Sequence, residues 1–492
     1  LARAGLPSTH HLLPQEPVAR PEFDIVVIGG GAGGLVVAAG GAALGAKVAL
    51  VERHKMGGDC LWYGCVPSKT LIKSAQVAHA MRHADRWALD PAPPTVDLAR
   101  VMERVAGVIR GIEPNDSPER FRGLGVDVVL GAGRFTGPDS FEVEGRRLTA
   151  RTFVVATGSR PAVPPIPGLD AVPFLTNETL FDLRESVPHL IVVGGGPIGC
   201  EMAQAFRRLG SDVTVVDIAP GILPREDPDL AAVVHRALAD EGVRFHLGAA
   251  IDRVDGKAGD IRLILKPAAG GPLTVAGTHL LLAAGRKANV ESLNLEAAGV
   301  AVDRGRIVHR DLRTGNPNVY VIGDAAGGHQ FTHVAEHHAG IVLRHAIFRM
   351  RWTRPSSIVP WCTYTDPELA RVGLSEAEAK TRGVDHRVYR FSFDENDRAR
   401  TEGETGGFAK LVTSPKGKLL GAAIVGPHAG ELIAEYVLAL TKGMKAADIS
   451  ATIHTYPTLA QINRRVADQR LKEGLTPSSK AWIRRICRLR GT

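Results

Sequence analysis

The chain has 492 residues, 44% of them hydrophobic but only 5% aromatic, which predicts an α/β protein of about two to four domains with aliphatic cores. No run of about 18 apolar residues occurs, so no membrane-spanning helix is expected. The net charge is +8, but no basic stripe of the kind that binds nucleic acid is visible, so binding to nucleic acid is not expected either. Five scattered cysteines do not form the disulfide framework of a secreted protein, and we expect a cytoplasmic one.

The first twenty residues lack a long apolar core and carry scattered proline, histidine and serine, which predicts a disordered leader over residues 1–20. An organellar targeting peptide is the alternative, because Glu16 is the only acid here, although the segment is poor in arginine. Ordered structure is therefore expected to begin near residue 21.

A dinucleotide-binding fingerprint follows directly. Residues 23–28 form a continuous apolar strand, which leads into a run of glycines, an alanine-rich helix and a second strand that ends at Glu52. In such a motif Gly29 makes the tight turn, Gly31 lets the backbone approach a pyrophosphate, and Gly34 lets helix and strand pack closely. The acid at the end of the second strand is expected to bind an adenosine ribose.

Two cysteines, Cys60 and Cys65, stand five positions apart in a glycine-rich turn before a helix predicted over residues 66–84. A thiol at the start of a helix faces unpaired N–H groups and the positive end of the helix dipole, which favours the thiolate. The second thiol can close a small disulfide, so the pair can cycle between disulfide and dithiol. Lys69, one turn past Cys65, adds a positive charge.

The spacing, the chain position and the trailing Val-Pro-Ser-Lys make this segment resemble the redox-active disulfide of the flavin-dependent pyridine nucleotide–disulfide oxidoreductases. That family includes dihydrolipoamide dehydrogenase, glutathione reductase and mercuric reductase. The resemblance implies FAD, NAD(P)H as electron donor, Cys65 as the flavin-facing thiol and Cys60 as the interchange thiol. A structural disulfide or two unrelated buried thiols is the alternative, which the glycine turn leading into a helix disfavours.

The family resemblance extends to further flavin-binding segments. Residues 151–160 form a strand that ends in a turn like the one closing on the flavin nucleotide, and Gly323-Asp324 resembles the motif whose aspartate binds the ribityl chain. A helix from about Phe331 would direct its N-terminus at the flavin ring. The predicted FAD-binding residues are Gly29, Gly31, Ala32, Gly33, Gly34, Glu52, Arg53, Gly58, Lys69, Thr157, Gly158, Asp324 and Ala325.

The fingerprint repeats later in the chain. Asp217 lies 23 positions after Gly194, as Glu52 does after Gly29, with strand, glycine turn, helix and strand in the same order. The acid favours NADH, since a 2′-phosphate would meet it, while Arg225 leaves NADPH open. The predicted NAD(P)-binding residues are Gly194, Gly196, Pro197, Ile198, Gly199, Asp217 and Gly285.

Two further predictions concern charged and metal-binding groups. Glu201 is similar to the family's glutamate that pairs with the lysine of the disulfide helix, so we expect a Lys69–Glu201 pair, with a solvated helix glutamate as the alternative. Among the histidines between residues 329 and 338, only His333 and His337 share a helix face, and no metal site is predicted.

From residue 359 to about 474 the pattern changes to α+β, and residues 365–373 and 426–431 resemble the family's dimerisation domain, which implies a homodimer whose active sites are completed by the partner subunit. The predicted fold is therefore α/β with two Rossmann-like domains and an α+β domain. The predicted boundaries are 21–160 and 286–355 for the FAD-binding domain, 161–285 for the NAD(P)-binding domain, 356–475 for the dimerisation domain and 476–492 for a basic tail.

The chain departs from the disulfide reductases at their His-Pro-Thr segment. Tyr456 holds the position of the histidine that acts as acid and base, and Gln461 that of the glutamate which orients it; His454 lies two residues earlier, where relatives also often carry one. A phenol with a pKa of about 10 is less suited to thiol deprotonation at neutral pH than an imidazole near 6.5. Efficient oxidation of dihydrolipoamide is therefore not expected.

Mercuric reductases resemble the chain in having a tyrosine close to this position, but they end in a vicinal cysteine pair where the chain has only Cys487. We expect a mercuric reductase-like enzyme that passes electrons through Cys60 and Cys65, with Tyr456 at the partner's site, to a thiophilic metal ion or a small disulfide. Dihydrolipoamide dehydrogenase is the enzymatic alternative. A non-catalytic redox sensor or a membrane-associated flavoprotein is the alternative from another class. The basic, amphipathic tail could rest on an anionic membrane, although a solvated helical end is the favoured interpretation.

Overall fold

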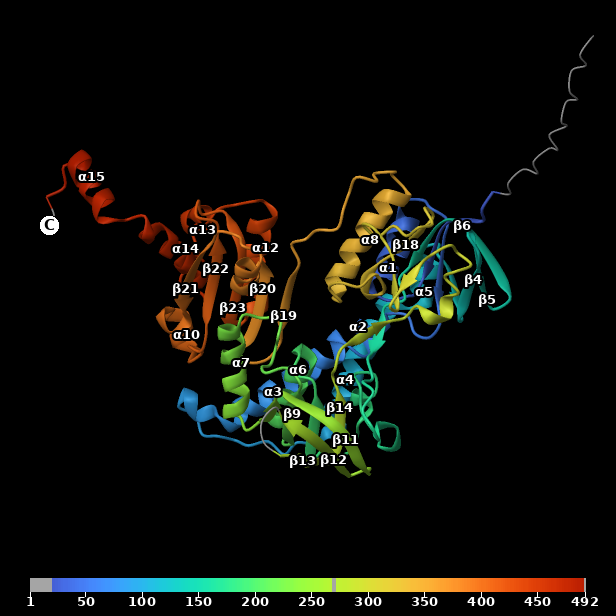
Figure 1. Ribbon diagram of the computed structural model, residues 1–492, viewed down its shortest axis with the longest axis horizontal. Coiled ribbons are helices and arrows are strands. Elements are labelled where there is room, and N and C mark those ends of the chain that lie inside the picture. Colours follow the sequence, from blue (N-terminus) through green and yellow to red (C-terminus); the bar gives the residue numbers. More distant parts are fainter. Residues whose placement is uncertain (1–19, 268–270, 491–492) are drawn as a thin grey trace, which may run out of the picture.

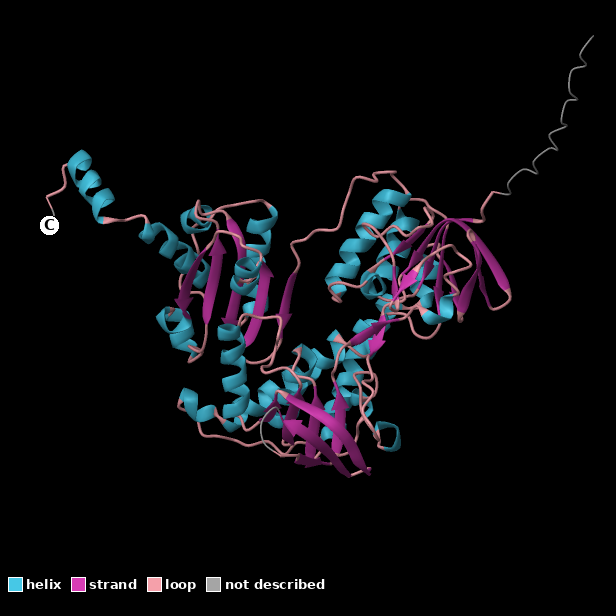
Figure 2. Ribbon diagram, viewed as in Figure 1, coloured by secondary structure: helices cyan, strands magenta, loops and turns pink. Residues whose placement is uncertain are grey.

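A computed structural model of the protein describes residues 20–267 and 271–490, so all but the last residue of the predicted leader lies outside it. The described chain forms two α/β units and one α+β unit, shown at the right, bottom and left of Figure 1. Each unit is built on its own main sheet, as Figure 2 shows. The predicted fold class is confirmed.

The first unit has a sheet in the order β3-β2-β1-β6-β5-β4, with β18 also paired to β6. Its strands are β1 (Phe23–Ile28), β2 (Val48–Glu52), β3 (Asp127–Leu130), β4 (Gly133–Gly137), β5 (Ser140–Val143), β6 (Arg146–Val155) and β18 (Val319–Val321). Its helices are α1 (Ala32–Ala43), α2 (Gly58–Trp62), α5 (Pro118–Gly123) and α8 (Thr332–Ala346). Helices α3 (Cys65–Arg82) and α4 (Leu98–Ile112) belong to the same stretch of chain but lie beside the second unit in Figure 1. The short hairpin of β16 (Val302–Asp303) and β17 (Arg306–Ile307) lies before β18. Strands β1 and β2 are mostly apolar and almost wholly buried, because the sheet is covered on both faces.

The second unit has a parallel sheet in the order β10-β9-β8-β14. Its elements are β8 (His189–Val193), α6 (Pro197–Arg208), β9 (Asp212–Asp217), α7 (Pro228–Asp240), β10 (Arg244–Leu247) and β14 (His279–Leu282). A separate antiparallel sheet, which the sequence did not predict, joins β11 (Ala249–Lys257), β12 (Asp260–Pro267) and β13 (Leu273–Gly277). The two chain crossings between the units pair as β7 (Ser159–Pro161) and β15 (Arg286–Ala288).

The third unit has an antiparallel sheet in the order β19-β20-β23-β22-β21. Its strands are β19 (Pro360–Thr363), β20 (Glu368–Gly373), β21 (Arg387–Ser392), β22 (Phe408–Thr413) and β23 (Leu419–Gly426). Its helices are α9 (Glu376–Thr381), α10 (Asp397–Glu402), α11 (Ala429–Leu432), α12 (Ala434–Thr441), α13 (Ala446–Ala451) and α14 (Gln461–Glu473), followed by α15 (Pro477–Cys487). This arrangement agrees with the α+β pattern that the sequence predicts from residue 359 to about 474.

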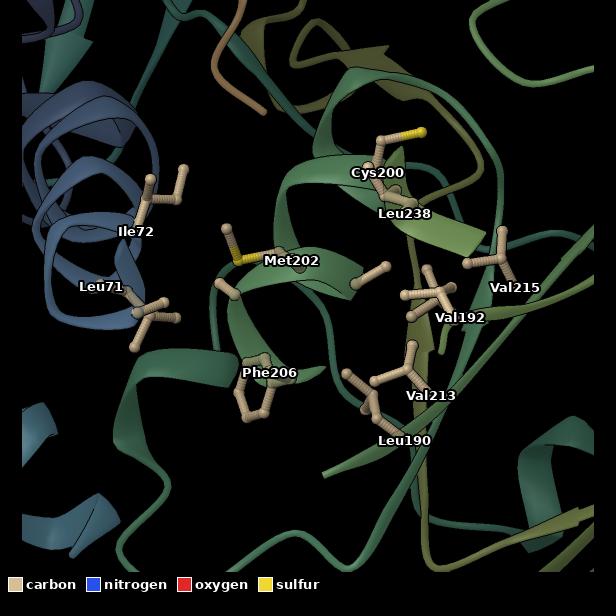
Figure 3. Packing of buried hydrophobic residues seen from close by; sticks show 14 of the residues in the cluster. Leu71, Ile72, Leu190, Val192, Cys200, Met202, Phe206, Val213, Val215 and Leu238 are labelled. Carbon is tan, nitrogen blue, oxygen red and sulfur yellow. The ribbon is translucent and has the colours of Figure 1, made fainter. Parts of the chain in front are cut away.

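A shared hydrophobic core fixes the helix that carries Cys65. Leu71 and Ile72 of α3 face α6, whose Met202 and Phe206 fill the space between them, as Figure 3 shows. The opposite side of α6 packs on strands β8 and β9. Because α3 rests on α6 rather than on loops, residues at the start of the two helices are held in register.

Glycine is required where each dinucleotide helix meets its strand. Gly29 and Gly194 have φ of +109° and +115°, which other residues rarely adopt. A Cβ at Gly34 would lie 1.9 Å from the Gly29 carbonyl oxygen, and one at Gly199 would lie 1.9 Å from that of Gly194. The roles that the sequence predicts for these glycines therefore follow from backbone contact.

The substitution Gly199→Ala is expected to push α6 away from β8 and to weaken binding of NAD(P)H. Overpacking of this kind costs about 1–3 kcal/mol of stability. Because the displaced start of α6 would bind the diphosphate less well, we expect the KM for NADH to rise by roughly tenfold, which corresponds to about 1.4 kcal/mol of binding free energy. Steady-state kinetics would measure the change. Gly221→Ala in the same unit is the matched control, because its Cβ would meet no atom within 4 Å, and it should leave the KM unchanged.

Candidate active site

A cavity of about 1270 Å³ lies where the three units meet, and most of the residues predicted from sequence line it. The lining residues among them are Gly29, Gly31, Ala32, Gly33, Glu52, Arg53, Gly58, Cys60, Cys65, Lys69, Thr157, Gly158, Gly194, Gly196, Pro197, Ile198, Glu201, Asp217, Gly285 and Asp324. Gly34, Gly199 and Ala325 lie outside the lining; the two glycines instead hold helices against strands. Tyr456 also lies outside it.

The first glycine turn is shaped to take a dinucleotide. Helix α1 follows Gly31 without a side-chain cap, so the amides of its first turn are free to bind a diphosphate. The Glu52 carboxylate accepts hydrogen bonds from the amides of Gly30, at 2.7 Å, and His54, at 2.8 Å, which fixes it at the end of β2. A Cβ at Gly58 would lie 2.7 Å from the Gly31 Cα, so the thiol-bearing segment is packed directly on this turn. These features fit FAD.

The second glycine turn repeats the arrangement. Helix α6 follows Gly196 without a side-chain cap, and a Cβ at Gly196 would meet no atom within 4 Å. The Asp217 carboxylate accepts hydrogen bonds from the amides of Gly195 and Ala219, as Glu52 does in the first unit. The turn therefore fits a second dinucleotide, which would lie in the same cavity as the first.

At the ribityl position, Asp324 lies in a short 3-10 helix, Gly323–Ala326, between β18 and α8. Its carboxylate accepts a hydrogen bond from the Ser159 hydroxyl at 2.6 Å, and Arg286 lies 3.8 Å away. Burial raises the pKa of Asp324 above its usual value, against the opposing effects of Ser159 and Arg286. The side chain is thus held at the cavity wall, where it is predicted to meet FAD.

The two thiols that are predicted to be redox-active line the same cavity. Cys60 is in the short helix α2, not in an irregular turn as predicted, and Cys65 is the first residue of α3. Both are free thiols, and Cys60 is hydrogen-bonded to Cys65. The Thr332 hydroxyl at the start of α8 lies 3.5 Å from the Cys65 sulfur. Two helix N-termini therefore converge on Cys65, and only one of them was expected from its place in the sequence.

The two thiols differ in pKa. The hydrogen bond from Cys60 lowers the pKa of Cys65 to about 6 against the opposing effect of burial, with help from Thr332 and Lys69. The same hydrogen bond, together with burial, raises the pKa of Cys60 above its usual value. Cys65 is therefore the thiolate and Cys60 the thiol at neutral pH.

Alkylation of the reduced protein should reveal this low pKa. Thiolate is lost as the pH falls through the pKa, so the rate at which iodoacetamide modifies Cys65 should stay level down to about pH 6 and decline below it. A rate that instead declines from pH 9 downward would indicate an unperturbed thiol. Peptide mapping would separate Cys65 from the exposed Cys487, which serves as an internal reference.

Lys69 and Glu201 form the predicted pair. The lysine Nζ lies 2.8 Å from the carboxylate, which is 5% exposed and also accepts a hydrogen bond from the Tyr364 amide at 3.0 Å. The Lys69 ammonium also lies 4.3 Å from the centre of the Tyr364 ring. Burial works against the charge on Lys69, but Glu201 more than compensates, so the pKa of Lys69 is raised and its charge is kept near Cys65.

A second charged group beside the thiols was not predicted. The Asp59 carboxylate, next to Cys60, lies 2.9 Å from the Arg286 guanidinium and accepts a hydrogen bond from Asn177 at 3.1 Å. Arg286 also donates to Ser159, so it connects the thiol segment to the strand crossing. The sequence places Arg286 directly after the strand that closes the second unit, but no local pattern indicates that its partner is Asp59.

Tyr456 lies in the third unit, 64% exposed, and its hydroxyl donates a hydrogen bond to Asp397 at 3.2 Å. Within one chain it does not reach the thiol pair's cavity. Its predicted place at the partner subunit's site stays a prediction.

Comparison with known proteins agrees with this geometry. The profile of the pyridine nucleotide-disulphide oxidoreductases matches residues 23–339, and that of the family's dimerisation domain matches residues 359–466. A mercuric reductase from Bacillus cereus is 35% identical over 443 residues, which cover 89% of this chain and 70% of that protein. A dihydrolipoyl dehydrogenase from Thermus scotoductus is 36% identical over 465 residues, which cover 89% of this chain and 95% of that protein.

Among solved structures, the Cu(II) complex of the HOCl-induced flavoprotein disulfide reductase RclA from Escherichia coli matches with a TM-score of 0.81 at 28% identity. The match covers 92% of this chain and 100% of that one. Two converging dinucleotide sites, the thiol pair between them and these matches lead to one conclusion. The chain belongs to the pyridine nucleotide-disulphide oxidoreductase family, whose members are enzymes that use FAD and NAD(P)H.

Proposed function

We propose that the enzyme uses NAD(P)H to reduce a thiophilic metal ion, such as mercuric ion, at Cys60 and Cys65. Bound FAD supplies the two-electron carrier between nicotinamide and thiols. In the overall reaction the hydride of NAD(P)H provides the two electrons that convert Hg(II) to Hg(0), and a proton is released. Two copies of the chain, joined through the dimerisation domain, would form the working enzyme.

The state of Cys60 carries the proposal. Its pKa is raised by Cys65 and by burial, so Cys60 keeps its proton at neutral pH. A disulfide acceptor needs a base to remove that proton, whereas a soft metal ion displaces thiol protons when it binds. Tyr456 holds the position of the family's basic histidine, and a phenol is less suited than an imidazole to take up a proton at neutral pH. The metal ion is therefore the acceptor that this thiol pair suits.

The names of similar proteins support the same class of acceptor. One relative is a mercuric reductase, and RclA was solved as a Cu(II) complex. The second candidate is dihydrolipoamide dehydrogenase, because the Thermus scotoductus relative of that name is 36% identical to the chain.

Parallel assays with thiol-complexed Hg(II) and with dihydrolipoamide would distinguish the two. We expect NADPH or NADH oxidation to depend on Hg(II), and dihydrolipoamide oxidation to be slow. The double substitution Tyr456→His and Gln461→Glu would restore a histidine and its orienting acid, and should raise lipoamide turnover by about 10²-fold.

Tyr456→Phe is the matched control, since it removes only the hydroxyl. Brisk lipoamide turnover by the unmodified enzyme, lost in Tyr456→Phe, would overturn the proposal in favour of dihydrolipoamide dehydrogenase.

A further inference from the structure

The segment that follows α14 stands apart from the rest of the protein. Figure 1 shows α15 at the far end of the molecule, beyond the third unit. The hydrogen bonds that the structure gives residues 476–490 stay within residues 474–490. In the part of the chain that the structure describes, none of its basic side chains forms an ion pair. We call residues 474–490 the C-terminal basic segment.

The helix in this segment has two chemically different faces. Trp482, Ile483 and Ile486 lie on one side at helical spacing, and Trp482 and Ile486 are 65% and 58% exposed. Lys480, Arg484 and Arg485 lie on the other side. An apolar face of this kind in water is costly unless something covers it, and an aromatic residue beside cations is typical of helices that lie in a membrane interface.

The charge of the segment indicates what covers the apolar face of its helix. The C-terminal basic segment carries Lys480, Arg484, Arg485, Arg488 and Arg490 and no acid. These five cations supply most of the chain's net charge of +8, and the rest of the chain is itself weakly positive. A second copy of the chain or the enzyme's own body therefore offers no overall electrostatic attraction, whereas an anionic lipid surface does.

The length of α15 determines how it could lie relative to a bilayer. Eleven residues at about 1.5 Å each make a helix of about 16 Å, roughly half the thickness of a bilayer's hydrocarbon core. No helix in residues 20–267 or 271–490 has the length and apolar character needed to span a membrane. Helix α15 is thus suited to lie in the plane of the interface.

We propose that the C-terminal basic segment docks the enzyme on an anionic membrane surface, with Trp482 and Ile486 inserted among the lipids and the arginines at the headgroups. The rest of the enzyme would remain in water, tethered through Gly474–Thr476. This docking is independent of the identity of the electron acceptor.

Flotation of the full-length holoenzyme with vesicles tests the proposal. Vesicles of equal parts phosphatidylglycerol and phosphatidylcholine should carry the enzyme at low salt, and vesicles of phosphatidylcholine alone should not. Arg484→Glu with Arg485→Glu should weaken binding about thirtyfold or more, and Trp482→Ser with Ile486→Ser about tenfold. The NADH-dependent activity of both variants should stay unchanged.

Arg253→Glu with Arg304→Glu is the matched control, because both arginines are exposed and the net charge changes equally. The proposal fails if the unmodified enzyme does not float, if it binds neutral vesicles equally, or if the control variant loses binding to the same extent. Loss of the dimer in the α15 variants, measured by analytical ultracentrifugation, would instead place the segment on the second copy. Binding to heparin without binding to vesicles would assign it to an acidic polymer.

Discussion

Cys65→Ser is expected to lower turnover with a metal or disulfide acceptor by about 10³-fold or more, the order of loss that follows removal of a reacting nucleophile. Serine cannot form a disulfide, and its hydroxyl does not ionise near neutral pH. The variant therefore has no dithiol to carry two electrons from the cofactor to the acceptor. Reduction of bound FAD by NADH should persist, because both dinucleotide sites are left intact. Visible absorption and acceptor-dependent NADH oxidation measure the two steps separately.

The control for this variant is Cys487→Ser, which removes an exposed thiol remote from the cavity and should leave turnover unchanged. Near-normal turnover with the acceptor in Cys65→Ser would mean that the acceptor takes electrons directly from the flavin. Loss of NADH-driven flavin bleaching would instead point to a damaged cofactor site.

Lys410→Met is expected to produce the largest loss of stability. The Lys410 side chain is 1% exposed and lies 3.1 Å from Asp227, 2.6 Å from Asp229 and 3.2 Å from Glu376. Asp227 and Asp229 lie at the start of α7 in the second unit, whereas Lys410 and Glu376 belong to the third unit. Removing the cation leaves the buried Asp227 without its ion-pair partner, whereas Asp229 keeps Arg390 and Glu376 keeps Lys380. We expect a cost of about 3–5 kcal/mol, because a buried charge is left unpaired.

Urea unfolding followed by circular dichroism would measure the change in the free energy of unfolding. Lys416→Met on the loop after β22 is the control, since its side chain is exposed and should shift that free energy by less than about 0.5 kcal/mol. A midpoint for Lys410→Met equal to that of the unmodified protein would show that solvent compensates the acids. The interpretation of the Lys410 cluster as a stabilising contact between the two units would then be wrong.

Local sequence patterns were sufficient to predict the two dinucleotide turns and the thiol pair. Each rests on residues within about 25 positions, where glycine spacing, a terminal acid and strand–helix alternation restrict the backbone. The Lys69–Glu201 contact spans 132 positions, and only the family resemblance could suggest it. The structure then gives its physical basis, which is the packing of α3 on α6.

The contacts that sequence reasoning missed all join distant segments. Thr332 reaches Cys65 across 267 positions, and Lys410 reaches Asp227 across 183. Neither residue lies in a distinctive local pattern, so only the arrangement of the three units reveals its partner. Helix α2 was missed because glycines and cysteines at Gly57–Cys60 are typical of turns, although Gly57 in the left-handed region allows the helix to begin there.

The central claim is that Cys60 and Cys65 exchange electrons with NAD(P)H as a disulfide and dithiol. The oxidised holoenzyme would be treated with excess NADH without oxygen, then denatured, and its thiols counted with Ellman's reagent. The account predicts a gain of about two thiols per chain over the untreated enzyme, and no gain in Cys60→Ser. Equal thiol counts before and after NADH in the unmodified enzyme would contradict it.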